Sequence, residues 1–189
     1  MTSVILPDIV ESSSGRLSEV YTLPTGEGYL LELLRDVFEN YWEDIVFGPV
    51  IEGVAYEFRC PCKPKTISLS NGYLTVHFGG THFHLCIGQV RGMDGRSMDH
   101  VLNEARRVSR AEIIRRLNRE GGATSWSLQL FNGKGEQVMT IFFANPFMTN
   151  EDTMAEFPDW TKLAMWEDIG RRYLGRELDD TDHKATGFF

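Results

Sequence analysis

Residues 65–88 read KTISLSNGYLTVHFGGTHFHLCIG, and two pairs of turn residues divide this stretch into three segments. Asn71-Gly72 and Gly79-Gly80 each stand between runs of alternating apolar and polar residues. Two-residue turns of this composition favour β-hairpins, because both central positions need a positive φ angle. The stretch therefore predicts a three-stranded antiparallel meander over about 65–70, 73–78 and 81–87.

The two turns also predict which residues face each other across the strands. Across the second turn, His77 should face His82. Other facing pairs are Thr66–His77, Thr75–His84 and Tyr73–Cys86. Since side chains alternate between the two sides of a sheet, the meander should have one apolar and one polar face. The apolar face comprises Ile67, Leu69, Leu74, Val76, Phe78, Phe83, Leu85 and Ile87; the polar face comprises Thr66, Ser68, Tyr73, Thr75, His77, His82, His84 and Cys86.

Apolar residues at helical spacing predict two helices that cover the apolar face. The first spans about 27–45, with Thr25 as its N-cap. The second spans about 97–119, with Ser97 as its N-cap. Its buried stripe would comprise Met98, Val101, Leu102, Ala105, Val108, Ile113 and Leu117, and the rest of its surface carries Arg106, Arg107, Arg110, Arg115, Arg116 and Arg119.

A second antiparallel hairpin is predicted further along the chain. Residues 125–131 and 137–143 flank Asn132-Gly-Lys-Gly135, a turn rich in residues that tolerate positive φ angles. The meander 65–87 and the hairpin 125–143 together predict an α+β fold with a mainly antiparallel sheet, packed on one face by helices 27–45 and 97–119. The other face would stay partly open, as a shallow cup.

The remaining segments carry weaker signals. Residues 54–60 alternate as a strand does, and Asp159 is placed to cap a C-terminal helix. Residues 1–25 read as an irregular lead-in, and 176–189 as an acidic, mobile tail whose final Gly-Phe-Phe could dock on a partner or a second copy. With 189 residues, the chain is expected to be a single globular domain, 1–189.

Composition argues against several kinds of partner. With a net charge of −8, the chain is not expected to bind nucleic acid or an anionic membrane, so the arginines are interpreted as a solvated face paired with acidic neighbours. The alternative is that the arginines form a basic stripe that binds phosphate or nucleic acid. The N-terminus lacks signal-peptide features, no apolar run approaches the ~20 residues of a membrane span, and three cysteines make no disulfide framework. These features favour a cytoplasmic protein and are compatible with a homo-oligomer.

Three of the five histidines and all three cysteines lie within residues 60–86. The histidines would share the polar face, and the Cys-Pro-Cys connection would enter the meander at the same end. Imidazole nitrogens and thiolates bind zinc, iron and copper. The sequence therefore predicts a metal-binding protein with a three-histidine or mixed histidine/cysteine site and zinc or iron as the metal. The candidate ligands are His77, His82, His84, Cys60, Cys62 and Cys86.

Such a site could be catalytic, because an open coordination position lets a bound water act as a nucleophile. Glu57 and Tyr73 are then candidate acid/base groups, and a Cys–His nucleophile using Cys86 or Cys62 is a further reading. The alternative is a noncatalytic module whose polar face binds a small molecule or a partner protein, with Tyr73, Thr75 and Glu57 as contacts. Haem binding is intermediate between a metal centre and a small-molecule site, because a single histidine or cysteine can serve as the axial ligand of the haem iron. Histidines also occur on exposed sheet faces without such a role.

Overall fold

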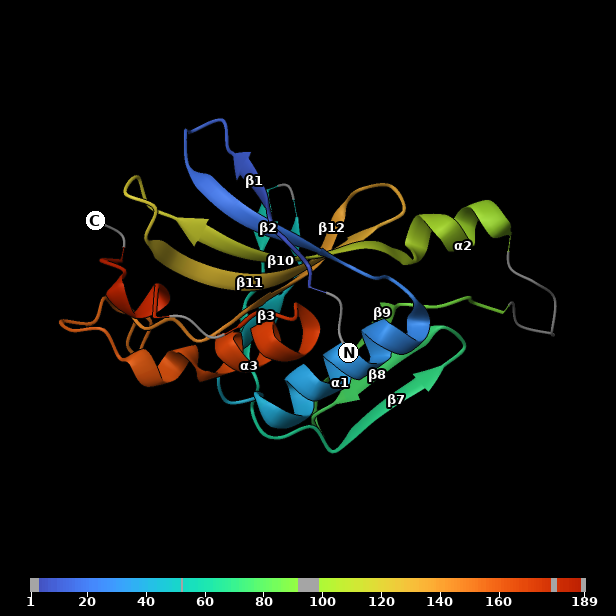
Figure 1. The fold of residues 1–189 in the computed structure, drawn as a ribbon. Coiled ribbons are helices and arrows are strands. Elements are labelled where there is room, and N and C mark those ends of the chain that lie inside the picture. Colours follow the sequence, from blue (N-terminus) through green and yellow to red (C-terminus); the bar gives the residue numbers. More distant parts are fainter. Residues whose placement is uncertain (1–3, 52, 92–98, 178–179, 188–189) are drawn as a thin grey trace. The chain divides into compact units, whose positions relative to one another are not determined.

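The computed structural model describes residues 4–51, 53–91, 99–177 and 180–187 (Figure 1). It has an α+β fold with mostly antiparallel sheets, which confirms the predicted fold class. The helices are α1 (Glu27–Asn40), α2 (His100–Arg106) and α3 (Ala164–Tyr173), with the short 3₁₀ helices η2 (Trp160–Leu163) and η3 (Asp182–Lys184). The strands are β1 (Asp8–Glu11), β2 (Leu17–Leu23), β3 (Val46–Gly48), β4 (Val50–Ile51), β5 (Val54–Ala55), β6 (Phe58–Arg59), β7 (Thr66–Ser70), β8 (Tyr73–His77), β9 (His82–Cys86), β10 (Val108–Leu117), β11 (Ala123–Asn132) and β12 (Gln137–Phe142).

The chain divides into two compact units. Unit 1 comprises Met1–Thr22, Glu112–Leu128 and Ile141–Phe189; unit 2 comprises Leu23–Ala111 and Gln129–Thr140. Over the described residues, the largest sheet has the order β1-β2-β10-β11-β12-β3-β6, and the other sheets are β7-β8-β9 and β4-β5. The sequence predicted one sheet, whereas the meander and the second hairpin lie in different sheets. That the whole chain is a single domain stays a prediction.

The meander in unit 2 forms with the predicted register. His77 faces His82 across the second turn, and Phe78 closes that hairpin by donating its backbone N–H to the Thr81 carbonyl at 2.9 Å. The other predicted pairs, Thr66–His77, Thr75–His84 and Tyr73–Cys86, are also present. At the first turn, Asn71 and Gly72 have φ angles of 50° and 75°, as a type I′ turn requires.

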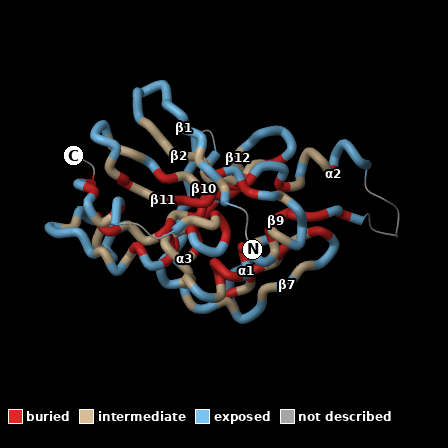
Figure 2. Tube along the Cα trace, viewed as in Figure 1, coloured by how far each residue is buried: buried red, intermediate tan, exposed pale blue. Residues whose placement is uncertain are grey.

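Helix α1 packs on the apolar face of the meander, as the sequence predicts (Figure 1). Phe38 of α1 is fully buried, with its ring centroid 5.4 Å from that of Phe83 and 6.3 Å from that of Phe78. Figure 2 colours the buried residues of α1 red. The helix is shorter than the predicted 27–45, because it ends at Asn40, and its N-cap is Gly26 rather than Thr25.

The predicted helix 97–119 is wrong. Helix α2 covers only His100–Arg106, and the chain then enters the ten-residue strand β10. Within β10, Ala111, Ile113 and Arg115 are buried in alternation, which is the period of a strand. Apolar and β-branched residues in this run fit both periods, and pairing in a sheet overrode the helical spacing. Two predicted residues of this helix, Ser97 and Met98, lie outside the described residues.

Two further expectations about unit 1 are corrected. The lead-in 1–25 is not irregular, because β1 and β2 pair as an antiparallel hairpin. Tyr21 and Leu23 of β2 are each 3% exposed, and this short alternation is the sequence signal of the strand. In the acidic segment that was expected to be mobile, Asp182 is buried within η3. Asp159 does cap the C-terminal helical segment, since its carboxylate accepts the Thr161 N–H at 3.1 Å.

The second hairpin is present as β11 and β12, close to the predicted bounds. The apolar residues Trp126, Leu128 and Leu130 are buried as expected, but the polar residues Ser127 and Gln129 between them are buried as well. This strand is therefore covered on both sides. None of the described helices is long and apolar enough to cross a membrane.

Candidate functional site

The predicted histidines lie together on the polar face of the meander in unit 2. His82 and His84 are exposed and His77 is half-buried. The rings of His77 and His82 stack across the strands, with centroids 5.6 Å apart and an angle of 18° between their planes. The ring of His84 meets that of His82 edge-on, at 5.0 Å and 72°. The sequence therefore placed three imidazoles correctly on one surface.

The ring nitrogens are held by separate local hydrogen bonds. Nδ1 of His77 accepts the backbone N–H of Gly79 at 3.1 Å, so the neutral ring carries its proton on Nε2 and offers no lone pair there. Nδ1 of His84 is 2.7 Å from Oγ1 of Thr75. When Nδ1 donates in that bond, the Nε2 lone pair of His84 is available to a ligand. No described residue forms a hydrogen bond with His82.

These orientations do not build the predicted three-ligand metal centre. Within the described part of the chain, no group of three His, Cys, Asp or Glu side chains is placed to hold a metal ion. Stacking of His77 on His82 brings ring faces together, whereas metal ligation needs lone pairs in the ring planes to converge. The sequence predicted the shared face, and that these three imidazoles bind one metal ion stays a prediction.

The cysteines lie around the same sheet but do not add ligands to it. Cys62 is at the His77 end, as predicted, and its thiol donates to the Phe78 carbonyl at 3.1 Å. Burial, with a smaller contribution from neighbouring Cys62, raises the pKa of Cys60 to about 12. Burial also raises the pKa of Cys86, although Arg107 and Arg106 oppose that shift. Protonated thiols are poor nucleophiles and poor metal ligands, so the raised pKa of Cys86 does not favour this residue as a nucleophile.

The polar face is open at one end and closed at the other. Cys86 is only 6% exposed, and it lies close enough to Arg106 and Arg107 to feel their positive charges. Tyr73, its cross-strand partner, is half-buried and interacts with the Cys86 thiol. The exposed histidines mark the open end. The polar face thus has exposed imidazoles at one end and two guanidinium groups near its other end.

That Glu57 and Tyr73 act as acid/base groups stays a prediction. Glu57 is exposed in the segment between β5 and β6, and Tyr73 lies at the Cys86 end of the face. No metal-binding group of described residues includes either Glu57 or a histidine. Thr75 is the one predicted contact residue that bonds directly to an imidazole.

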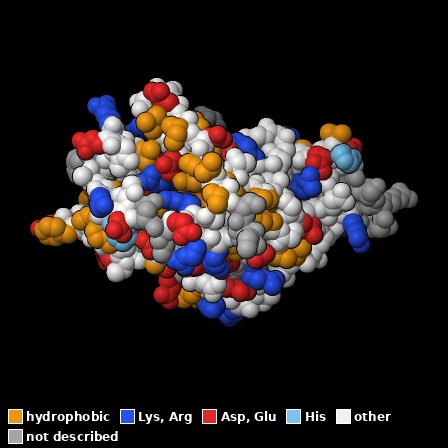
Figure 3. Space-filling view, in the orientation of Figure 1, with side chains coloured by type: hydrophobic (Ala, Val, Ile, Leu, Met, Phe, Trp, Pro, Cys, Tyr) orange, Lys and Arg blue, Asp and Glu red, His pale blue; other side chains and the backbone are white. Residues whose placement is uncertain are grey.

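The arginines of the wrongly predicted helix have several environments. Arg107 pairs with Glu104 at 2.9 Å, and the guanidinium of Arg110 lies 3.5 Å above the Phe131 ring. On the face drawn in Figure 3, basic side chains are interspersed with acidic ones. That the arginines do not bind nucleic acid stays a prediction.

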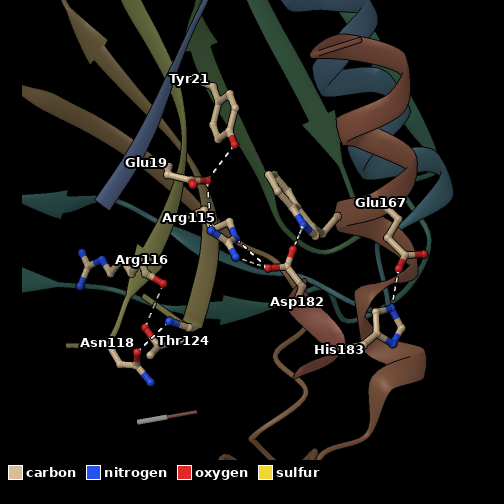
Figure 4. A network of polar contacts seen from close by, with 11 residues as sticks. Glu19, Tyr21, Arg115, Arg116, Asn118, Thr124, Glu167, Asp182 and His183 are labelled. Carbon is tan, nitrogen blue, oxygen red and sulfur yellow. Dashed lines mark hydrogen bonds and ion pairs between the residues drawn. The ribbon is translucent and has the colours of Figure 1, made fainter. Parts of the chain in front are cut away.

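Sequence reasoning missed a buried polar cluster in unit 1 (Figure 4). Arg115 of β10 is paired with Glu19 of β2 at 3.1 Å and with Asp182 of η3 at 2.5 Å. Asp182 also accepts the indole N–H of Trp166 at 2.6 Å. Arg115 and Asp182 are 67 residues apart in the sequence, so no local pattern predicts their contact.

Comparison with known proteins assigns a family. Residues 7–175 match the model of the family of unknown function DUF7676. The chain belongs to this family. No curated protein matches this DUF7676 member.

Two solved structures resemble its fold distantly. One is the crystal structure of ChuX, with 17% identity and a TM-score of 0.43, covering 80% of this chain and 74% of that one. The other is a protein from Erwinia carotovora, with 17% identity and a TM-score of 0.39, covering 73% of this chain and 67% of that one.

Proposed function

We propose that this protein is a noncatalytic small-molecule-binding protein that binds haem on the polar face of β7, β8 and β9. The observation that carries the proposal is the orientation of His84 on the exposed end of that face. A haem iron needs only one axial imidazole from the protein, so a surface without three convergent ligands still suffices. The noncatalytic reading therefore fits this geometry better than a three-histidine metal centre.

His84 is the axial ligand in this proposal. Its exposed ring is fixed by the 2.7 Å contact between Nδ1 and Oγ1 of Thr75. A hydrogen bond from the far ring nitrogen orients an imidazole and raises its basicity, which favours coordination through Nε2. His82 lies edge-on beside it and offers a flat π face against which a planar macrocycle can pack.

The charge of the closed end complements the anionic part of such a ligand. Arg106 and Arg107 lie near Cys86, two residues along β9 from His84, which is roughly 7 Å at the usual rise of a strand. Guanidinium groups pair well with carboxylates. At the open end, the Lys65 side chain lies beside Gly79, next to His77. Carboxylate substituents of the bound macrocycle would face these cations.

The test is titration of the purified protein with ferric haem, followed by its absorption spectrum. We expect one equivalent to bind with an axial-imidazole spectrum, and His84→Ala to abolish that spectrum. Thr75→Val should weaken binding, because it removes the hydroxyl that orients the ring. His100→Ala, at an exposed position of α2, is the matched control and should bind as the unaltered protein does.

Two comparisons separate axial ligation from adsorption of a hydrophobic ligand. Metal-free protoporphyrin should bind more weakly, because it offers no iron to His84. Equal binding of haem by the protein and by its His84→Ala variant would overturn the proposal.

A further inference from the structure

The outer strand formed by β5 and β6 in unit 2 is exposed along its whole length. It pairs with β4 and β3 in one continuous register, and between these pairs the Tyr56 N–H donates to the Pro49 carbonyl at 3.0 Å. All six residues 54–59 are exposed. No described strand pairs with the other edge of β5 or β6. A strand edge of this kind is a template on which a further strand can pair.

The same segment also presents an apolar surface. Four of its large side chains are between 45% and 56% exposed: Ile51, Val54, Tyr56 and Phe58. Ile51 faces Val54 across the strands, and the rings of Tyr56 and Phe58 have centroids 4.3 Å apart. The Phe58 ring also lies 6.2 Å from that of Phe47, which is buried. Contiguous exposed apolar side chains that include aromatic rings are typical of interaction sites, and the contact with Phe47 fixes this one to the core.

The charges along the edge fit a second copy of the same strand. Glu57 and Arg59 flank Phe58, and all three are exposed. If two copies pair antiparallel with Phe58 facing Phe58, each Glu57 faces the Arg59 of the other copy, and the two-fold axis repeats this contact. The register that instead places Glu57 opposite Glu57 brings like charges together, which destabilises a sheet. Because a guanidinium has five N–H donors, the new contact leaves the contacts of Arg59 within its own chain in place.

We propose that the edge 54–59 is a homodimer interface, in which β6 pairs antiparallel with β6 of a second copy around Phe58. The occupant is a second copy because the edge is complementary in charge to itself. The pairing covers the exposed side chains of Tyr56 and Phe58 and extends the sheet of each chain into the other. A contact of one strand pair is at the small end of specific interfaces, so the dimer should dissociate at micromolar concentrations. This interface does not rest on the proposed haem site.

Sedimentation velocity of the full-length protein from about 1 to 500 μM tests the proposal. We expect the sedimentation coefficient to rise from the monomer to the dimer value. Glu57→Arg should raise the dissociation constant about tenfold or more, because two opposite-charge pairs become two like-charge pairs. The double variant Glu57→Arg/Arg59→Glu should restore dimerisation, since each facing pair is again of opposite charge. Glu11→Arg is the matched control on the exposed strand β1, and it should dimerise as the unaltered protein does. Both single changes, from −1 to +1, take the net charge from −8 to −6, so weaker overall repulsion cannot explain a loss of dimer in one of them.

Hydrogen exchange of the unaltered protein gives a second readout that needs no variant. The Tyr56 N–H points toward Pro49, and amide directions alternate along an antiparallel strand, so Glu57 and Arg59 direct their N–H groups to the outer edge. Peptides that cover 54–59 should therefore exchange more slowly at 500 μM than at 1 μM, by about the fraction of dimer formed, whereas peptides of β1 should not change. A monomer at all concentrations, or a dimer that Glu57→Arg leaves unchanged, would overturn the proposal. A folded double variant that stays monomeric would overturn the register, and if that variant does not fold, the exchange of 54–59 decides.

Discussion

Replacing Arg115 with methionine should destabilise the protein by about 3–5 kcal/mol, the usual cost of removing one partner of a buried ion pair. The Arg115 side chain is 5% exposed, and its partners Asp182 and Glu19 are 6% and 21% exposed. Methionine fills similar volume, so the loss comes from leaving two carboxylates without their cation. At 2–4 °C per kcal/mol for a chain of this size, the unfolding midpoint should fall by about 6–20 °C.

Urea unfolding followed by both circular dichroism and tryptophan fluorescence measures this loss. Arg171→Met is the matched control in the same unit, because Arg171 is 54% exposed and pairs with Asp168 at 3.5 Å. Such exposed pairs contribute about 0–1 kcal/mol. If the two variants lose equal stability, Arg115 is not the buried centre of a charge cluster. A smaller loss in the double variant Arg115→Met/Asp182→Asn than in Arg115→Met would confirm that the stranded carboxylate carries the cost.

Three further predictions concern the core, the first turn and the thiols. Phe38→Ala should cost about 3–5 kcal/mol in urea unfolding, because the ring is fully buried among other aromatic rings, whereas Phe157→Ala, 76% exposed, should cost under about 0.5 kcal/mol. Gly72→Ala should lower the unfolding midpoint well below that of Gly80→Ala, since its φ angle is 75° and its Cβ would lie 2.6 Å from a backbone oxygen; equal midpoints would contradict this. With a pKa of about 12, the Cys60 thiol is about one part in 10⁴ thiolate at pH 8, so its alkylation, measured by mass spectrometry, should be slow and should accelerate about tenfold per pH unit up to that pKa.

The meander was predictable because its signals are local. Asn71-Gly72 requires two positive φ angles in succession, and the structure has 50° and 75° there. A two-residue loop leaves one register, and that register decides the face of every side chain on either strand. The same reasoning placed Phe78 and Phe83 against a helix, which α1 provides through Phe38.

The run after His100 was not predictable in this way. Val108 and Ile113 are β-branched and suit a strand, yet with their neighbours they also match helical spacing. No glycine or proline separates α2 from β10, so no local sequence signal marks the boundary at Arg107. Burial of Arg115 depends on Glu19 and Asp182, which are distant in sequence. Contacts with residues distant in sequence therefore decided that this segment forms a strand.

The histidine face also combines a feature that the sequence predicts, the shared surface, with one that it does not predict, the orientation of each ring. Backbone alternation determines that His77, His82 and His84 share a surface, and that much follows from two turns. The direction of each ring nitrogen depends on a rotation about the side-chain bonds, and hydrogen bonds with Gly79 and Thr75 set that rotation in two of the three rings. Shared position therefore predicts where a ligand can approach, whereas the bonds at Nδ1 decide which imidazole can coordinate it. For this reason the proposal depends on His84 and its Thr75 partner rather than on the number of histidines.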